Sequence, residues 1–244
     1  MNEQRDLDGL SALVTGATSG IGKAAAEELA RHGAEVIVHG RDAARGAAVV
    51  STITSEGGKA RFAAADLSDP GQLADLVEQA GAVDILVNNA GISWPGPTAD
   101  LGVATFDRLF TANVRAPYFL VAALAPKMAA QGSGSVINIG SQAGQVGMSG
   151  TAAYSGTKGA LASMTRSWAA EFSPDGVRVN AVAAGPVYTP IQPYEAAEAV
   201  GAGTIMARVA QPDEIASVIV FLASAKASYI TGAVVAVDGG RTAI

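Results

Sequence analysis

The chain has no cysteine and only two histidines among its 244 residues. Without thiols it can form neither disulfides nor a thiolate metal site, and we expect it to bind no metal. Aromatic residues make up only 5% of the sequence, whereas alanine and glycine are abundant, a composition that favours helices packed closely on a sheet.

Long apolar runs and basic clusters are also missing. No run approaches the roughly 20 apolar residues of a membrane span, and the polar first residues lack the apolar core of a signal peptide. The net charge is −6, whereas nucleic acids are bound by clusters of Lys and Arg. We therefore expect a cytoplasmic protein that binds neither membranes nor nucleic acid.

Short β-branched apolar runs alternate with helical stretches along the whole chain. They predict seven strands, at residues 10–14, 34–39, 60–65, 84–89, 135–140, 177–182 and 233–237. Continuously apolar strands separated by helices indicate a parallel sheet that is covered on both faces. With right-handed crossovers, the pattern predicts a doubly wound, Rossmann-type α/β fold. No linker or repeat interrupts it, so we expect a single domain over residues 1–244.

A glycine-rich stretch at residues 15–22 lies between the first predicted strand and the next helix. Glycines let the backbone approach a phosphate, and the first N–H groups of the helix face it. The stretch predicts a dinucleotide-binding turn, with a tight strand–helix turn without a ligand as the alternative.

The second predicted strand ends in His39-Gly40-Arg41-Asp42, where a dinucleotide fold meets the adenosine ribose. An acidic residue here would bind a 2′-hydroxyl, but Gly40 takes that place and the Arg41 guanidinium suits a 2′-phosphate. We therefore predict NADP(H) over NAD(H). The alternative is an ordinary exposed arginine, which could also pair with Asp42. His32 and His39 are expected to be surface or turn residues.

Polar residues also follow the third and fourth predicted strands. Asp66 can accept a hydrogen bond from an adenine amino group or form a turn. Asp69 and Pro70 predict the start of a helix. Residues 88–91, Asn-Asn-Ala-Gly, suit either a crevice where backbone meets a ligand or a simple turn.

Tyr154 and Lys158 give the sharpest catalytic signal. They lie four residues apart in a helix predicted to run to about Phe172, and residues at this spacing share a helix face. The ammonium would favour the phenolate and lower the pKa of Tyr154 from its usual value of about 10. Tyr154 is thus a candidate general acid and base, although such pairs are also common on helix surfaces.

Two further polar residues lie where a site is expected. Ser141 follows the fifth predicted strand, and its hydroxyl could bind a substrate carbonyl. No histidine lies near it in the sequence and a nucleophile elbow is missing, which disfavours a serine hydrolase. Asn113 lies inside a predicted helix, where asparagine fits poorly, so it could hold a local irregularity or a water.

Together these residues resemble the short-chain dehydrogenases/reductases over almost the whole chain, and in particular their NADP-preferring, 3-oxoacyl-reductase-like members. The matching positions are residues 15–22, 88–91, 180–186, 230–232 and 237–240 with Asp66, Asn113, Ser141, Tyr154 and Lys158. One departure is Ala184, where the family usually has proline.

The resemblance implies an NAD(P)-dependent enzyme that interconverts a carbonyl and a secondary alcohol. Tyr154 would donate or accept the proton, and Lys158 would lower the pKa of Tyr154 and hold the nicotinamide ribose. Ser141 would orient the carbonyl, and Asn113 would support a water-linked proton relay. The expected cofactor-binding residues are Gly16, Thr18, Ser19, Ile21, Arg41, Asp66, Leu67, Asn89, Gly91, Tyr154, Lys158 and Val187. Residues 1–140 would form the cofactor-binding half, and residues 141–244 the catalytic and substrate-loop half.

Substrate specificity is expected in the loops at residues 93–97, 142–150 and 188–205. Trp94, Gln145 and Tyr188, together with Ser141, are the candidate substrate contacts, and Gln192 is a further polar candidate. The apolar loops predict a small, fairly apolar substrate. The alternatives are a 3-oxoacyl-[acyl-carrier-protein] reductase, which would want basic residues at the site mouth, a sugar (glucose-type) dehydrogenase, and a non-catalytic dinucleotide-binding regulator.

An oligomer is also expected. Residues 114–130 and 159–170 are rich in small and apolar side chains, as helices packed between subunits can be. With the resemblance, this pattern predicts a homotetramer or a dimer.

Overall fold

All seven predicted strands are present and form one parallel sheet in the computed structural model, which describes residues 5–191 and 193–243. The strands are β1 (Ser11–Val14), β2 (Glu35–Gly40), β3 (Lys59–Ala64), β4 (Ile85–Asn88), β5 (Gly134–Ser141), β6 (Val177–Ala184) and β7 (Val234–Val237). Their order is β3-β2-β1-β4-β5-β6-β7. The chain therefore changes direction across the sheet between β1 and β4, the place where open α/β sheets bind ligands.

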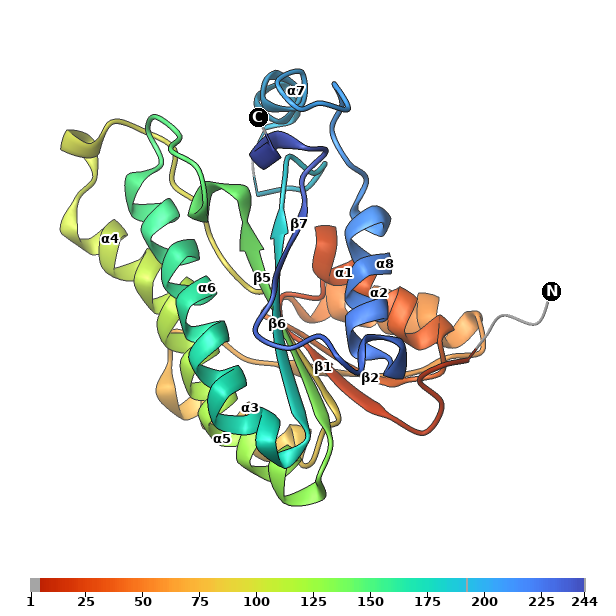
Figure 1. Ribbon diagram of the computed structural model, residues 1–244. Helices are drawn as coiled ribbons and strands as arrows, with labels where there is room; N and C mark the ends of the chain where they lie inside the picture. The colour runs from red at the N-terminus through yellow and green to blue at the C-terminus, as the bar shows by residue number, and fades with distance from the viewer. Residues whose placement is uncertain (1–4, 192, 244) are drawn as a thin grey trace.

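Helices cover both faces of the sheet, as predicted (Figure 1). One layer holds α1 (Gly20–Arg31), α2 (Ala43–Ser55) and α8 (Pro212–Ala223), and the other holds α3 (Pro70–Ala80), α4 (Val103–Phe110), α5 (Ala116–Gln131) and α6 (Ala152–Phe172). The short helix α7 (Tyr194–Gly201) lies near the chain's C-terminal end, at the top of Figure 1. Among the described residues, none of the helices is long and apolar enough to cross a membrane.

The sheet separates two apolar cores. Val14 of β1 packs with Leu29 of α1 and Ile219 of α8 in one core, whereas the adjacent Leu13 packs with Leu120 of α5 in the other. Both faces of the central strands are thus buried, which explains why their sequences are continuously apolar rather than alternating.

Side-chain caps fix where two of the helices begin. The Asp69 carboxylate accepts hydrogen bonds from the backbone N–H groups of Gly71 and Gln72, and Pro70 takes the first position of α3, as predicted. Asp42 caps α2 by accepting from the backbone N–H of Arg45 and pairs with the Arg45 side chain at 2.9 Å. Arg41 is exposed, and among the described residues it forms no ion pair with Asp42.

Candidate active site

Lys158 and Tyr154 lie in the first turns of α6, against the carboxyl end of β5. The Nζ atom of Lys158 donates a hydrogen bond to the backbone carbonyl oxygen of Ile139 at 2.8 Å and lies 5.7 Å from the centre of the Tyr154 ring. The lysine is only 7% exposed, and this burial lowers its pKa to about 8. The ammonium is thus anchored between the strand and the helix, beside the phenol.

The Tyr154 phenol lies close enough to the side chain of Ser141, the last residue of β5, for the serine to favour the phenolate. Ser141 Oγ also accepts from the backbone N–H of Ala143 at 3.1 Å, which fixes the hydroxyl at the strand end. The expected lowering of the Tyr154 pKa is wrong for the chain by itself. Burial raises the pKa of Tyr154, because a phenolate loses its hydration there, and only the Ser141 side chain acts in the other direction.

Asn113 lies in a π-helical segment, Thr111–Arg115, between α4 and α5. The irregularity expected at this position is thus present. Its Oδ1 accepts from the backbone N–H of Ile92 at 2.9 Å, and its Nδ2 donates to the carbonyl of the same residue at 2.9 Å. Nδ2 also donates to Thr157 Oγ1 at 3.1 Å, and Thr157 donates to the backbone carbonyl of Tyr154 at 2.7 Å.

Thr157 is a residue that sequence reasoning missed. It is fully buried and joins Asn113 to the turn of α6 that carries Tyr154. Its position between Tyr154 and Lys158 was the available signal, because the third residue after Tyr154 must lie on nearly the same helix face.

The glycine-rich loop is wedged between β1 and the end of β4. Gly16 has a φ of +64°, and a Cβ on it would lie 2.9 Å from the Cα of Ala90. Asn89 Nδ2 donates to the carbonyls of Thr15 and Gly16 at 2.9 and 3.2 Å. A Cβ on Gly22 would collide with Asn89 Nδ2 and with the carbonyl of Gly16. Any side chain at these two glycines would therefore displace the loop.

His39 does not lie at the surface or in a turn, so that expectation is wrong. It is 3% exposed in β2, and its two ring nitrogens contact the Gly16 amide and the Ala65 carbonyl. The strand continues through His39 to Gly40, so the ring is enclosed by neighbouring segments. His32 is half-buried after α1, with Nε2 3.5 Å from Glu28.

The candidate substrate residues lie on three loops. Gly96 N donates to the Gly150 carbonyl at 2.9 Å, which joins the first loop to the second, and the Trp94 ring packs over Gly96. In the third loop, the Tyr188 ring meets that of Tyr194 edge-on at 5.5 Å. Gln145 is exposed, and Gln192 lies outside the described residues.

A sequence profile of the family described as "Enoyl-(Acyl carrier protein) reductase" matches residues 16–242. The cis-4-hydroxycyclohexanecarboxylate dehydrogenase of Sinomonas cyclohexanicum is 38% identical over 242 residues, which are 96% of each chain. A solved structure of a short chain dehydrogenase/reductase family protein superimposes with a TM-score of 0.92 at 51% identity, covering 98% of this chain and 100% of the other. This chain belongs to the short-chain dehydrogenase/reductase family.

The chain is therefore an NAD(P)-dependent oxidoreductase with the family's Rossmann-type fold. A further solved structure, the gluconate 5-dehydrogenase from Burkholderia cenocepacia J2315 in complex with NADP and tartrate, is 30% identical with a TM-score of 0.92 and covers 99% of this chain and 98% of the other. The nicotinamide dinucleotide expected from the sequence is thus the cofactor class of this short-chain dehydrogenase/reductase.

The loop geometry fits such a cofactor. Ser19 precedes α1 without forming a side-chain cap among the described residues, which leaves the first amides of a 12-residue helix to face an anion. The backbone also approaches other residues closely at Gly91, because a Cβ there would lie 2.9 Å from Asn113 Oδ1 and 3.7 Å from Lys158 Nζ. The backbone at Gly91 thus lies directly beside two of the candidate catalytic residues.

The remaining cofactor candidates line the same edge of the sheet. Thr18 packs against Gly40, where a Cβ would lie 2.5 Å from the threonine methyl. Leu67 and Val187 are buried after β3 and β6, and Ile21 is half-buried in α1. Asp66 accepts a hydrogen bond from the Ser68 amide at 2.9 Å, which lowers its pKa, so the turn that it was expected to form is present.

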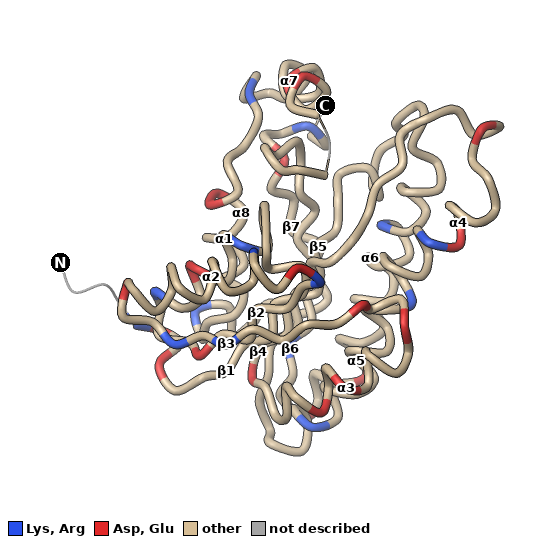
Figure 2. The backbone as a smooth tube through the Cα atoms, turned by 180° about the vertical axis from the view of Figure 1, so that it is seen from behind, with Lys and Arg blue, Asp and Glu red and all other residues tan. Residues whose placement is uncertain are grey.

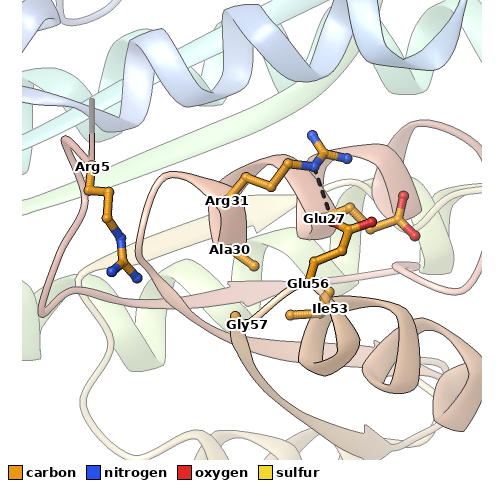
Figure 3. A pocket seen from close by; sticks show the side chains of 8 residues that line it. Arg5, Glu27, Ala30, Arg31, Ile53, Glu56 and Gly57 are labelled. Atoms are coloured by element: carbon orange, nitrogen blue, oxygen red, sulfur yellow. Dashed lines mark hydrogen bonds and ion pairs between the residues drawn. The ribbon is translucent and has the colours of Figure 1, made fainter. Parts of the chain in front are cut away.

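One cavity lies away from this site. It has a volume of about 310 Å³ and is bounded by Arg5, α1 and α2 (Figure 3). α1 and α2 end here and lead into the amino ends of β2 and β3, opposite the carboxyl ends that carry Ser141. Arg31 Nε contacts Glu56 at 3.3 Å within it, so the charges of these two side chains offset each other. We assign no catalytic role to this cavity.

Proposed function

We propose that this short-chain dehydrogenase/reductase uses NADP(H) to interconvert a carbonyl and a secondary alcohol on a small, fairly apolar molecule. The observation that carries this proposal is the convergence of Tyr154, Ser141 and Lys158 at the carboxyl end of β5. The dinucleotide would supply or accept the hydride, and the chain would supply position and a proton.

Each catalytic side chain has a separate task. Tyr154 would give its phenolic proton to the substrate oxygen during reduction and take it back during oxidation. Ser141, which lies near that phenol at the end of β5, would orient the carbonyl. Lys158, whose ammonium lies 5.7 Å from the centre of the Tyr154 ring, would hold the nicotinamide ribose. Asn113 would support the water-linked relay that returns the proton.

The preference for NADP(H) rests on the end of β2. A side chain at Gly40 would strike Thr18, so a carboxylate at this position, where it would bind a ribose 2′-hydroxyl, would have to displace the threonine side chain. Arg41 is exposed next to it, and Asp42, its neighbour, is already paired with Arg45. The Arg41 guanidinium can therefore serve a 2′-phosphate. Asp66 would bind the adenine, with Gly16, Thr18, Ser19, Ile21, Leu67, Asn89, Gly91 and Val187 along the dinucleotide.

The substrate proposal rests on the charges of the three loops. Residues 93–97, 142–150 and 188–205 contain no Lys or Arg, and the third loop contains Glu195 and Glu198. Figure 2 shows basic and acidic residues interspersed along the backbone. An acidic acyl carrier or a sugar acid would lack a cationic partner in these loops. Trp94, Gln145 and Tyr188 would contact the substrate. The Sinomonas relative is named for a ring hydroxy acid, and because these loops offer its carboxylate no cationic partner, we suggest the uncharged alicyclic ketone as the first compound to test.

Assembly forms part of the same proposal. Val103 and Phe106 of α4 and Tyr118 and Phe119 of α5 are 42–77% exposed, an apolar group that a second copy of the chain would cover. We propose a homotetramer or dimer located in the cytoplasm, with the two halves of one domain serving cofactor and substrate. Light scattering that gave a monomeric mass would reject the assembly.

The test is NADPH oxidation with three ketones: cyclohexanone, 5-ketogluconate and acetoacetyl-coenzyme A. We expect the highest kcat/KM with cyclohexanone, and we expect Tyr154→Phe to bind NADPH but lose turnover. A higher kcat/KM with the sugar acid or with the thioester would reject the small apolar substrate and favour a sugar dehydrogenase or a 3-oxoacyl reductase, respectively. NADPH binding without turnover of any carbonyl would favour the non-catalytic regulator.

A further inference from the structure

His39 is a buried ionisable residue in contact with the dinucleotide loop. It is the penultimate residue of β2 and is 3% exposed. Its backbone carbonyl accepts a hydrogen bond from Ala17 N at 2.8 Å, and its Nδ1 lies 3.2 Å from Gly16 N. One residue therefore binds two successive amides of the glycine-rich loop.

The hydrogen-bond partners define the protonation state of the ring. Gly16 N can only donate, so Nδ1 must be an acceptor without a proton. The Ala65 carbonyl, 3.1 Å from Nε2, can only accept, so Nε2 must carry the proton. Both contacts are satisfied together only by the neutral imidazole with its proton on Nε2.

We propose that His39 is a positioning residue that holds the dinucleotide-binding loop in its anion-binding shape only while the imidazole is neutral. The loop at Gly16 has a left-handed φ of +64° and is wedged against Ala90, so it has little freedom to find another partner for its amide. This inference rests on the proposed function, because it assumes that the loop binds a dinucleotide.

A second proton on the ring would disrupt this arrangement. It would be placed on Nδ1, directly opposite the Gly16 N–H, and would leave two donors facing each other in a buried site. Two charged groups act on the ring from the elements around it, namely Arg41 at the end of its own strand and Asp66 after β3. Arg41 opposes the imidazolium, whereas Asp66 favours it.

The balance of these effects keeps the ring neutral near pH 7. Burial has the largest effect and lowers the pKa of His39 below its usual value of 6.5, Arg41 lowers it further, and the Ala65 hydrogen bond and Asp66 raise it. The folded chain therefore holds this proton less tightly than the unfolded chain. The stability contributed by the neutral ring is complete above pH 6.5 and falls progressively below it, and the loop geometry is lost when the pH reaches the lowered pKa of the folded state.

Three variants test the inference by their equilibrium Kd for NADP⁺ and their melting temperatures between pH 8 and pH 5. His39→Asn offers an acceptor and a donor that do not titrate, His39→Phe offers neither, and His32→Asn is the matched control at the other histidine. The 2′-phosphate of NADP⁺ titrates near pH 6 with every variant alike. The ratio of the wild-type Kd to the variant Kd therefore reports only the protonation of the His39 imidazole.

At pH 8 we expect His39→Phe to bind NADP⁺ about tenfold more weakly than wild type, as for the loss of a buried hydrogen-bond partner. His39→Asn should bind within about threefold of wild type. The wild-type Kd should rise relative to that of His39→Asn as the pH falls from 8 to 5, whereas the ratio of the wild-type Kd to the His32→Asn Kd should stay constant.

Two outcomes would overturn the inference. Folded His39→Phe with wild-type affinity would do so, as would His39→Asn with the wild-type pH dependence, and the second decides the matter if His39→Phe does not fold. In both cases wild-type binding of NADP⁺ leaves the proposed function standing. If the wild-type protein binds neither NADP⁺ nor NAD⁺, both the proposed function and this inference are rejected.

Discussion

Asn113 Nδ2 donates a hydrogen bond to Thr157 Oγ1 at 3.1 Å, and Thr157 Oγ1 donates in turn to the backbone carbonyl of Tyr154. The turn that carries Tyr154, the proposed general acid/base, is thus hydrogen-bonded to the buried Thr157. Thr157 is in turn hydrogen-bonded to Asn113 of the π-helical segment between α4 and α5. The position of the phenol therefore depends on two residues that need not touch the substrate.

Replacement of Thr157 should separate positioning from folding. Thr157→Val keeps the shape but removes both hydrogen bonds, and should cost about 1–3 kcal/mol of unfolding free energy. We expect it to lower kcat more than it raises KM for the ketone. Thr157→Ser retains the hydroxyl and should recover most of kcat. Wild-type kcat in Thr157→Val would show that the hydroxyl does not position the phenol, and an equal loss in Thr157→Ser would show that the hydroxyl alone is not sufficient.

Removal of the buried ammonium should stabilise the chain in a pH-dependent way. The pKa of Lys158 falls from 10.5 to about 8 on burial, so the folded chain holds this proton less tightly than the unfolded chain. The free energy of unfolding of the wild-type protein therefore rises as the pH increases from about 8 to 10.5. The stability of Lys158→Met relative to wild type should therefore fall by up to about 3 kcal/mol between pH 7 and pH 10.

Urea unfolding at the two pH values measures this difference, with Lys127→Met as the control because Lys127 is exposed. The control should change little with pH. If the stability of Lys158→Met relative to wild type is constant, or grows with pH, the effect assigned to the burial of Lys158 is contradicted. Activity should be lost in Lys158→Met regardless of its stability.

The basis for cofactor preference can be tested at two neighbouring arginines. Arg41→Ala should weaken NADP⁺ binding about tenfold, as for a lost hydrogen bond to a charged group, and should leave NAD⁺ binding nearly unchanged. Arg45→Ala is the control, because Arg45 is exposed but paired with Asp42. Fluorescence titration with both dinucleotides gives the ratio, and equal effects of the two substitutions would remove Arg41 from the phosphate site.

A single methyl group at Gly91 should disturb the catalytic residues. Its Cβ would lie 2.9 Å from Asn113 Oδ1, closer than ordinary packing allows, so either the Asn113 contacts to Ile92 or the end of β4 must shift. We expect Gly91→Ala to lose at least about tenfold in kcat, since small misplacements of catalytic groups are costly. Gly102→Ala, which meets nothing within 4 Å, should retain full activity and the same melting temperature.

The sheet could be predicted because local information was sufficient. The run around Leu13 is apolar on both faces, and Pro70 follows a capping aspartate, so each segment carries its own signal. The shared face of Tyr154 and Lys158 follows from helical spacing alone. These features need no knowledge of distant parts of the chain.

The errors concern properties that distant segments create. His39 has an exposed, turn-like context in the sequence, but Gly16 and Ala65, 23 and 26 residues away, enclose its ring. The direction of the Tyr154 pKa was wrong because the desolvation of a phenol depends on what covers it, and spacing within one helix carries no such information.

The two contacts between Asn113 and Ile92 have the form of a peptide pairing. A carboxamide side chain presents one acceptor and one donor side by side, as a backbone peptide does, and Asn113 offers both to the N–H and C=O of Ile92. The segment that follows β4 is thereby held as though another strand lay beside it. The loop that carries Trp94 starts from this fixed residue, so its sequence could be redesigned for a different substrate without moving the groups that transfer the proton.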